Sequence, residues 1–481
     1  MSTMLIIIIV LIFEYFYDDI KKFRQNEIIL KSYVYSFMKI ISSDIVICGG
    51  GLSGMITCQA LSNIGISVSC VDKTTINFED ADDFRSTAYL SPSKRFLDEI
   101  GLWKHLSKHA NPLKILKIIN SESKFPFNKI VTEKDFCSDE ILKDEFGWNI
   151  NNNKTKLIIA KLLKDNPLVK YFDQNEIVSI DNDYNSLIIK LKNKKVINTK
   201  LLIGADGKNS FVRNYYNIGL NVKDLKQKAI TFIIEHNYPH NDVSSEIYLS
   251  GGPFTIVPMK NDINKNTSAV VWMDNSFYID FLLSLNNEKF EKEVNKRSCN
   301  ILGSIAVKSK LKTWEISSQV AKKLINDRVL LLGEAAHVLP PIGAQGLNLT
   351  LKDIKTIYDL IRKNRSKIGD FEMLSKYNFQ RMIDIKIRSK SVDFLNKISN
   401  SDEIIIKKAR DFGLNALDKI TPNDSVMIQW SYTERSARFQ TENKQTKIEK
   451  ITPWSLDKVS NVYYKHIHTN INDVYTAALC I

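Results

Sequence analysis

A glycine-rich turn between two apolar segments is the feature that most constrains the fold of this chain. Residues 44–48, Asp-Ile-Val-Ile-Cys, form a short apolar run typical of a strand buried in a parallel sheet. The sequence Gly49-Gly50-Gly51-Leu52-Ser53-Gly54 follows at once, and residues 55–64 and 67–71 then suit a helix and a second strand. Asp72 ends that second strand. This order of strand, turn, helix, strand and acid predicts a βαβ unit that binds a dinucleotide.

Each residue of the glycine turn has its own expected role. Gly49 permits the tight turn, Gly51 lets the backbone approach a pyrophosphate, and Gly54 lets the helix pack against the strand. The helix N-terminus offers unpaired N–H groups and the positive end of its dipole to the phosphates, and Asp72 is the expected ribose-binding acid. This motif alone leaves FAD and NAD open as the ligand.

Two later motifs also place a loop directly after an apolar strand. Residues 200–204 run into Ala205-Asp206-Gly207 and then Val212-Arg213. Residues 328–332 run into Gly333-Glu334-Ala335-Ala336-His337 and a loop rich in glycine and proline. After Gly346 the apolar positions keep helical spacing: Leu347, Leu351, Ile354, Ile357, Tyr358 and Ile361. A loop that leads into a helix N-terminus suits a group carrying developing negative charge.

The three motifs, in this order and spacing, resemble the class A FAD-dependent aromatic hydroxylases related to para-hydroxybenzoate hydroxylase. Within that class the chain resembles the ubiquinone-biosynthesis hydroxylases, over about residues 40–420. The residues that carry the resemblance are Asp82-x-x-Arg85-x-x-Ala88, Gly101-Leu102-Trp103, the segments 204–210 and 254–258, Val271-Trp272 and the segment 328–353.

The resemblance implies a bound FAD and a role for each motif residue. Gly49, Gly51 and Gly54 would hold the pyrophosphate, Asp72 the adenosine ribose, and Arg85 would lie over the FAD chain. Asp206 and Gly207 belong to a motif linked to both FAD and NAD(P)H. Glu334, next to Gly333, stands where the family usually has an aspartate that contacts the ribityl chain, so its side chain is one methylene longer. The residues expected to wrap the flavin ring are Pro341, Gly343, Gln345, Gly346, Leu347 and Asn348.

The resemblance also implies a reaction: hydroxylation of the aromatic ring of a polyprenylated phenol in ubiquinone biosynthesis, by O₂, through a flavin C4a-hydroperoxide. The flavin carries this chemistry, so no catalytic side chain is assigned, and His337 is expected to orient its loop rather than act as a base. The electron donor is NAD(P)H or a redox partner. Two alternatives stay open: a flavoenzyme acting on a soluble phenol, and a catalytically weak accessory subunit of a quinone-biosynthesis complex.

The expected fold class is α/β, with a Rossmann-like FAD-binding domain interleaved with an antiparallel β-sheet substrate domain, plus C-terminal helices. Short β-like runs at 229–234, 246–249, 254–257 and 268–272 suggest the antiparallel sheet. Residues 371–397 and 404–417 suit helices. The expected domains are 40–113, 149–216 and 319–365 for FAD, 114–148 and 217–318 for the substrate, and 366–422 for the C-terminal helices.

Composition narrows the remaining function classes. The six cysteines include no CxxC pair and the seven histidines form no credible metal set, so no metal site is predicted. The formal net charge of +13 fits both a lysine-rich composition bias and attraction to an anionic surface. No basic run with interleaved aromatics appears, so nucleic acid is not an expected partner. A prenylated substrate favours peripheral attachment to a membrane, on the cytoplasmic side of the inner membrane.

The two ends of the chain differ from its middle. An apolar run at 5–13 is shorter than the roughly 20 residues that a spanning helix needs. Residues 1–37 are therefore expected to be an N-terminal extension, an upstream start rather than part of the fold, with an interfacial anchor and an amphipathic flank as alternatives. Residues 423–481 lose apolar periodicity and are expected to be a tail with no identified role.

Overall fold

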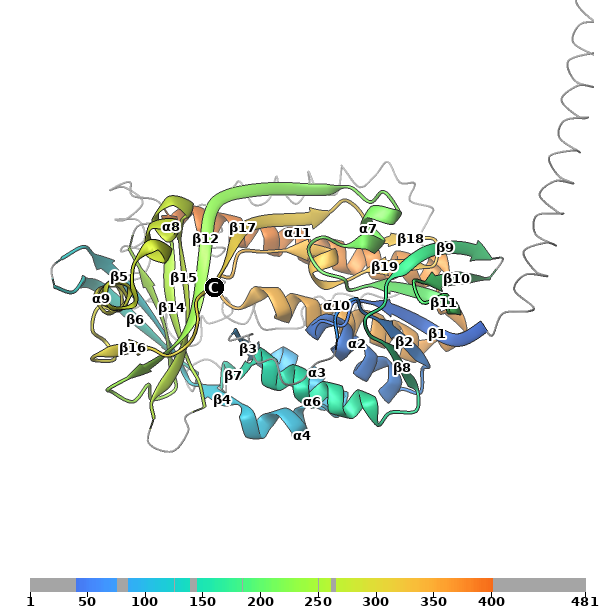
Figure 1. Cartoon of the computed structure of the whole chain (residues 1–481), viewed down its shortest axis with the longest axis horizontal. Coiled ribbons are helices and arrows are strands. Elements are labelled where there is room, and N and C mark those ends of the chain that lie inside the picture. Colours follow the sequence, from blue (N-terminus) through green and yellow to red (C-terminus); the bar gives the residue numbers. More distant parts are fainter. Residues whose placement is uncertain are drawn as a thin grey trace, which may run out of the picture.

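The computed structural model describes residues 40–75, 85–124, 126–138, 145–183, 185–249, 251–260 and 265–400. The extension 1–37, the expected helix at 404–417 and the tail 423–481 lie outside these described residues. Two sheets lie at opposite ends of the molecule, and long helices run between and beside them (Figure 1).

The first sheet has the parallel centre that the glycine motif predicts. Strands β19, β11, β1, β2 and β8 are parallel neighbours in that order, and β18, β10 and β9 extend the sheet with antiparallel pairs, so the sheet is mixed. The strands are β1 Ile40–Cys48, β2 Val68–Val71, β8 Val169–Phe172, β9 Ile177–Asp183, β10 Ser186–Leu191, β11 Val196–Gly204, β18 Ile325–Asn326 and β19 Val329–Leu331.

The second sheet contains the four β-like runs expected for the substrate domain. Its order is β20-β17-β12-β15-β14-β13-β5-β6, with β16 paired to β12. The strands are β5 Ile115–Glu122, β6 Lys129–Cys137, β12 Leu220–His236, β13 Val243–Tyr248, β14 Pro253–Pro258, β15 Thr267–Asn275, β16 Ile305–Val307, β17 Lys312–Ala321 and β20 His337–Val338. A small third sheet holds β3 Ser86–Leu90, β7 Gly147–Asn151 and β4 Asn111–Leu113.

The second sheet departs from the antiparallel expectation at one pair. Strands β5 and β13 run parallel, with Val243 opposite Ile115 and Tyr248 opposite Asn120. More than a hundred residues of chain separate the two strands, so no tight hairpin fixes their direction. The other pairs in this sheet are antiparallel among the described residues.

Helices cover both sheets and connect them. The longer ones are α2 Leu52–Asn63, α6 Asn152–Lys164, α10 Gln345–Lys363 and α11 Phe371–Asn400, so the expected helix at 371–397 is confirmed. The shorter ones are α3 Ser91–Glu99, α4 Trp103–Leu106, α7 Phe211–Tyr215, α8 Ser276–Ser284 and α9 Asn287–Arg297, with 3₁₀ turns η1 Ser107–His109, η2 Gly333–Ala335 and η3 Arg365–Lys367.

Two apolar cores separate on the two faces of the second sheet. On one face Phe254 and Trp272 pack with Ile279 of α8 and Phe290 of α9. On the other face Met273 joins the large core of the first sheet. This second face therefore looks toward the first sheet and its loops. Strand β17 runs through residue 318, where the expected domain boundary lies, and that domain division stays a prediction.

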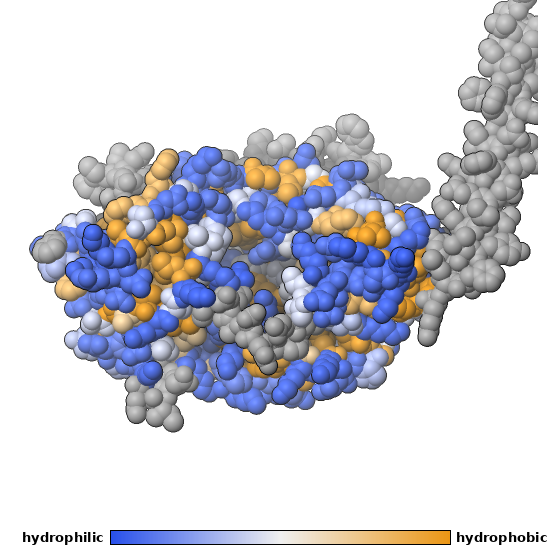
Figure 2. Space-filling view, in the orientation of Figure 1, coloured by the Kyte–Doolittle hydropathy of each residue, from blue (hydrophilic) through white to orange (hydrophobic). Residues whose placement is uncertain are grey.

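The surface carries a protruding apolar area on α8. Phe277 is 86% exposed and Phe281 is 51% exposed, and Figure 2 shows apolar side chains gathered around this helix. None of the helices in the described part of the chain is long and apolar enough to cross a membrane.

Candidate cofactor site

The three sequence motifs meet because their strands are parallel neighbours in one sheet. In the ladder, Cys48 lies opposite both Val71 and Gly204, and Gly204 lies opposite Leu331. Hydrogen bonds continue the alignment beyond the strands, since Ala205 N donates to the Cys48 carbonyl over 2.8 Å and Leu332 N donates to that of Gly204 over 3.0 Å. Four loops therefore leave the sheet at the same carboxyl edge, where α/β sheets bind their ligands.

In the glycine turn after β1 an added β-carbon would clash at Gly49, Gly50 and Gly54, and the position of Gly51 is open. Gly49 has a φ of +111°, and a β-carbon there would strike the Ala205 carbonyl. A β-carbon on Gly54 would strike the Gly49 carbonyl, so this residue sets how closely α2 approaches the turn. At Gly51 nothing of the protein lies within 4 Å of the β-carbon position. Gly51 thus leaves room for a pyrophosphate beside the backbone, and the cofactor roles of the three glycines stay predictions.

The N-terminus of α2 faces this turn without a side-chain cap. Gly51 is the N-cap residue, no side chain caps the helix, and no acidic residue lies in its first turn. The first N–H groups of the helix and the positive end of its dipole are therefore available for an anion. A phosphate group is an anion that such a helix N-terminus binds.

Two acidic side chains flank the turn. Asp72, at the end of β2, accepts hydrogen bonds from the backbone of Gly50 and from Thr74. Asp206, after β11, accepts from Val212 N over 3.1 Å through Oδ2. Its Oδ1 is buried, and among the described residues it has no hydrogen-bond partner. A buried acceptor without a partner is costly, so Asp206 is suited to receive a donor from a bound ligand.

The third motif, residues 333–346, contains η2 and β20 and ends in the first two residues of α10; it is called loop 333–346 below. Gly333 has a φ of +60°, and the N-cap residue Ala344 adopts a left-handed conformation with a φ of +55°. Helix α10 has neither a side-chain cap nor an acidic residue in its first turn. Its N-terminus is therefore a second place where negative charge on a ligand is stabilised.

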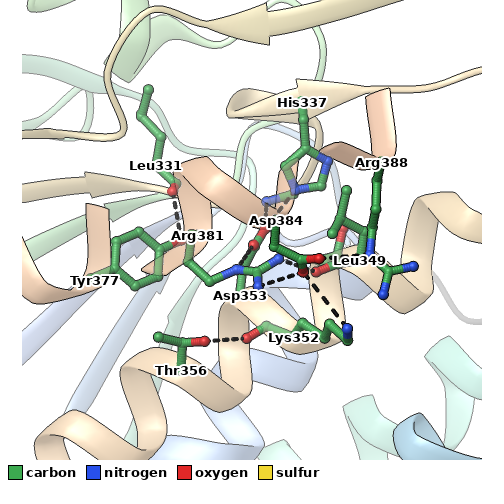
Figure 3. A network of polar contacts seen from close by, with 12 residues as sticks. Leu331, His337, Leu349, Lys352, Asp353, Thr356, Tyr377, Arg381, Asp384 and Arg388 are labelled. Carbon is green, nitrogen blue, oxygen red and sulfur yellow. Dashed lines mark hydrogen bonds and ion pairs between the residues drawn. The ribbon is translucent and has the colours of Figure 1, made fainter. Parts of the chain in front are cut away.

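A buried polar network on α10 and α11 holds loop 333–346 in place (Figure 3). Asp353 of α10 is fully buried and accepts from Gly333 N over 3.0 Å, while His337 Nε2 lies 2.7 Å from the same Oδ2. Arg381 of α11 donates from Nε to Asp353 Oδ1 over 2.7 Å. His337 is thus held by an acid below the loop, which supports the orienting role expected for it.

The same network reaches the first residue of α10. Arg381 also bonds Asp384 over 2.9 Å, and Arg388 bonds Asp384 over 2.9 Å and Gln345 Oε1 over 2.7 Å. Burial raises the pKa of Asp384, but the charges of Arg388 and Arg381 outweigh it and hold that pKa well below its usual range. Burial likewise opposes ionisation of Asp353, and contacts with His337 and Arg381 still keep its pKa lowered. Both aspartates are therefore ionised at neutral pH.

Arg213 ties the second motif to the third. Its side chain is buried and donates to the carbonyl of Lys208 over 2.8 Å and to that of Ala335 over 3.0 Å. Burial lowers the pKa of Arg213, and the nearby charge of Asp206 opposes that lowering. Loop 333–346 and the Asp206 loop are thus fixed relative to each other by one guanidinium.

The remaining predicted residues have distinct places. Gly207 has a φ of +81° and open space at its β-carbon position, and Gly346 is exposed with similar open space. Glu334 is exposed on η2, and Arg85 is exposed just before β3. The expected ring contacts Pro341, Gly343 and Leu347 are half-buried, whereas Gln345 is buried and bonded to Arg388.

The side chain of Asn348 is committed within the protein. Its Oδ1 accepts from Leu90 N over 3.0 Å, and its Nδ2 donates to the carbonyls of Ala88 and Ala344. These bonds join α10 to β3 and leave only the backbone of Asn348 for a ligand. A contact between the backbone of Asn348 and the cofactor stays a prediction. The other predicted cofactor contacts also stay predictions.

These residues fit a flavin dinucleotide. Open β-carbon positions at Gly51, Gly207 and Gly346 line one edge, the buried Asp206 oxygen lacks a partner, and two helix N-termini are uncapped. Among the described residues no group of three or more histidine, cysteine or acidic side chains could hold a metal ion. The fold and this edge define a dinucleotide-binding α/β protein with two interleaved sheets.

Comparison with known proteins supports that class. The FAD binding domain family matches residues 42–383, and the chain belongs to this family. The chain is 26% identical over 390 residues to the ubiquinone hydroxylase UbiL of Rhodospirillum rubrum, covering 79% of this chain and 87% of the relative. It is 23% identical to the 3-demethoxyubiquinol 3-hydroxylase of Escherichia coli, covering 78% and 95%.

Solved structures with the same fold extend the comparison. The p-nitrophenol 4-monooxygenase PnpA of Pseudomonas putida matches with a TM-score of 0.66 and 15% identity, covering 82% of this chain and 98% of that one. HpxO of Klebsiella pneumoniae, complexed with FAD, matches with a TM-score of 0.62 and 14% identity, covering 79% and 96%. Together the comparisons confirm the predicted resemblance to ubiquinone-biosynthesis hydroxylases, the FAD cofactor, the flavin-dependent monooxygenase class and the mixed α/β fold.

Sequence reasoning missed the residues that support the site from α11. Arg381, Asp384 and Arg388 are spaced three and four residues apart on one helix, but nothing in that spacing shows that they reach α10. Asp353 was within the resemblance but had no assigned role.

Proposed function

We propose that this protein hydroxylates the aromatic ring of a polyprenylated phenol in ubiquinone biosynthesis, with FAD as cofactor, O₂ as oxidant, and NAD(P)H or a redox partner as electron donor. The observation that carries the proposal is the meeting of the three motifs at one carboxyl edge. The names of its relatives, ubiquinone hydroxylase and 3-demethoxyubiquinol 3-hydroxylase, support the substrate class.

The protein itself would bind and orient the cofactor and would shield the flavin ring from water. Gly51 and the N-terminus of α2 would hold the pyrophosphate, Asp72 the adenosine ribose, and Asp206 would accept a bond from the cofactor. The N-terminus of α10 would stabilise negative charge on the flavin ring. When bound, FAD supplies the activation of O₂ that a protein side chain cannot. The inner face of the second sheet and loop 333–346 would exclude water from the ring.

The binding of the dinucleotide is tested on the purified protein. We expect a flavin absorbance spectrum and release of FAD on heating, because the contacts predicted at the edge are non-covalent. Protein that stays colourless after incubation with FAD would contradict the proposal.

The substrate is tested by mass-spectrometric profiling of quinone intermediates in cells that lack the protein. We expect one under-hydroxylated prenylated phenol to accumulate, and unchanged profiles would argue for a soluble phenol instead.

We also propose attachment to an anionic membrane surface, on the cytoplasmic side of the inner membrane, because a polyprenyl tail resides in lipid. The exposed aromatic side chains of α8, Phe277 and Phe281, suit insertion at the level of the headgroups. The net charge of +13 favours anionic lipid. A quinone-biosynthesis complex is a further candidate partner.

Vesicle flotation tests this attachment. Binding to anionic vesicles should weaken with salt, since surface charges are screened over about 8 Å at physiological ionic strength. The double variant Phe277→Ser, Phe281→Ser should float less than the wild type. The matched control is Phe371→Ser, which removes a side chain that is 80% exposed at the start of α11. Undiminished flotation of the α8 double variant would exclude α8 as the membrane contact.

A further inference from the structure

Two consecutive residues before α10 hold the backbone in a left-handed shape. Gly343 has a φ of +60° and Ala344 has a φ of +55°. Glycine adopts this region freely, but an alanine there is strained, and such strain persists only where the surrounding structure holds it. Ala344 is also the N-cap residue of α10, so its conformation sets how the backbone enters the helix.

Two buried amide side chains from the first turn of α10 hold the carbonyls of these residues. Gln345 Nε2 donates to the Gly343 carbonyl over 3.2 Å. Asn348 Nδ2 donates to the Ala344 carbonyl over 2.6 Å. A trans peptide is planar, so the N–H of Ala344 points opposite to the Gly343 carbonyl. The bond from Gln345 therefore also fixes the direction of the Ala344 N–H.

Arg388 of α11 decides which end of the Gln345 amide faces Gly343. Its Nη1 donates to Gln345 Oε1 over 2.7 Å. A guanidinium has donors and no acceptor, so it pairs with the oxygen of the amide and leaves the nitrogen for the Gly343 carbonyl. Arg388 also donates from Nε to Asp384 over 2.9 Å, and this second bond holds the guanidinium in place. A side chain of α11 thus controls a peptide plane of loop 333–346.

We propose that Arg388 is a positioning residue for the flavin: through Gln345 it turns the Ala344 N–H toward the cofactor edge, where this group donates to the negative charge of the reduced ring. The inference rests on the proposed role of loop 333–346. Hydrogen bonds to charged groups are stronger than those to neutral ones, so the Ala344 N–H stabilises reduced FAD more than oxidised FAD. Arg388 thereby raises the reduction potential of the bound flavin.

The test measures two quantities on the full chain: the dissociation constant for oxidised FAD, and the midpoint potential of bound FAD against a reference dye. In Arg388→Met the ratio of the affinities for reduced and oxidised FAD should fall roughly fivefold to tenfold. A tenfold fall lowers the midpoint potential by about 30 mV. Arg388→Lys keeps a charged donor and should recover part of the shift. Arg388→Met should fold, because Asp384 keeps its bond to Arg381.

A double-variant cycle tests whether Arg388 acts through Gln345. The variant Gln345→Met removes the amide itself and should lower the midpoint potential as much as Arg388→Met does. The double variant should lower it no further. Additive shifts would overturn the proposal, as would an unchanged potential in Arg388→Met. If Arg388→Met fails to fold, Gln345→Met still decides, since an unchanged potential in that variant also overturns the proposal.

The matched control is Arg362→Met, which removes the same charge near the other end of α10, about 25 Å along the helix from Gln345. Arg362 pairs with Glu99 and Asp359 at the surface. Its FAD affinity and potential should equal those of the wild type, and a shift as large as that of Arg388→Met would assign the effect to net charge and overturn the proposal. Wild-type protein that binds no FAD would instead refute the proposed function, and this inference with it.

Discussion

Arg381 of α11 and Asp353 of α10 form a buried ion pair, with Nε and Oδ1 2.7 Å apart. The other oxygen of Asp353 holds Gly333 and His337, so a helix late in the chain fixes the loop that follows β19. The cofactor edge is therefore supported by Arg381, a residue far along the chain from Gly333 and His337.

Replacing Arg381 by methionine should destabilise the protein strongly. The change leaves Asp353 buried without its cation, which typically costs about 3–5 kcal/mol. Chemical denaturation measures the effect as a lower unfolding midpoint. The control is Arg362→Met, because Arg362 pairs with Glu99 at the surface and such pairs contribute about 0–1 kcal/mol. Similar midpoints for the two variants would show that the buried pair contributes little.

The variant Gly51→Val should fold but lose FAD. Space at the β-carbon position and an ordinary extended backbone permit the side chain, which would then occupy the path of the pyrophosphate. Flavin absorbance and circular dichroism of the purified variant separate binding from folding. Gly219→Val is the control, since Gly219 is exposed near the flexible end of Lys322. If the Gly51→Val variant keeps FAD, the pyrophosphate does not bind at this turn.

The stabilising effect of Asp384 should vanish in acid. Its pKa is depressed in the folded state, so its stabilisation is present above the unfolded value of about 3.9 and is lost as the pH falls toward the folded value. Asp384→Asn should therefore unfold at lower denaturant than the wild type at pH 7. The two midpoints should converge as the pH drops below about 4. A difference that is constant with pH would show that the carboxylate charge does not contribute.

Substitution of His337 should affect the loop rather than the chemistry. His337→Gln can still bond Asp353, and we expect hydroxylation at a similar rate with FAD retained. His337→Ala removes a bond to a charged group, a loss of about 1.5–3 kcal/mol, and should weaken FAD binding. Stability and product formation are measured together for both variants. A Gln variant that binds FAD normally but forms no product would identify His337 as a catalytic group.

The part of the site that could be predicted consists of segments in which the residue types themselves require a particular backbone shape. Gly49, Gly51 and Gly54 occupy a strand-turn-helix context that only a few backbone shapes satisfy, so their roles could be read before the structure. The loop at Gly333 and the helix after Gly346 were equally readable. The parallel pairing of β5 with β13 was not, because strand direction depends on a long connection rather than on local pattern.

The sequence by itself determined the carboxyl ends of β1, β2 and β11, the glycine turn, the two later loops and the helix that follows them, because each depends on residues adjacent in the chain. Only the tertiary structure decided what holds those loops in place. Arg381 approaches Asp353 across two packed helices, and Arg213 reaches the carbonyl of Ala335 from the second motif. Such contacts depend on how whole helices and strands pack. The residue periodicity of one element does not predict which other element packs against it.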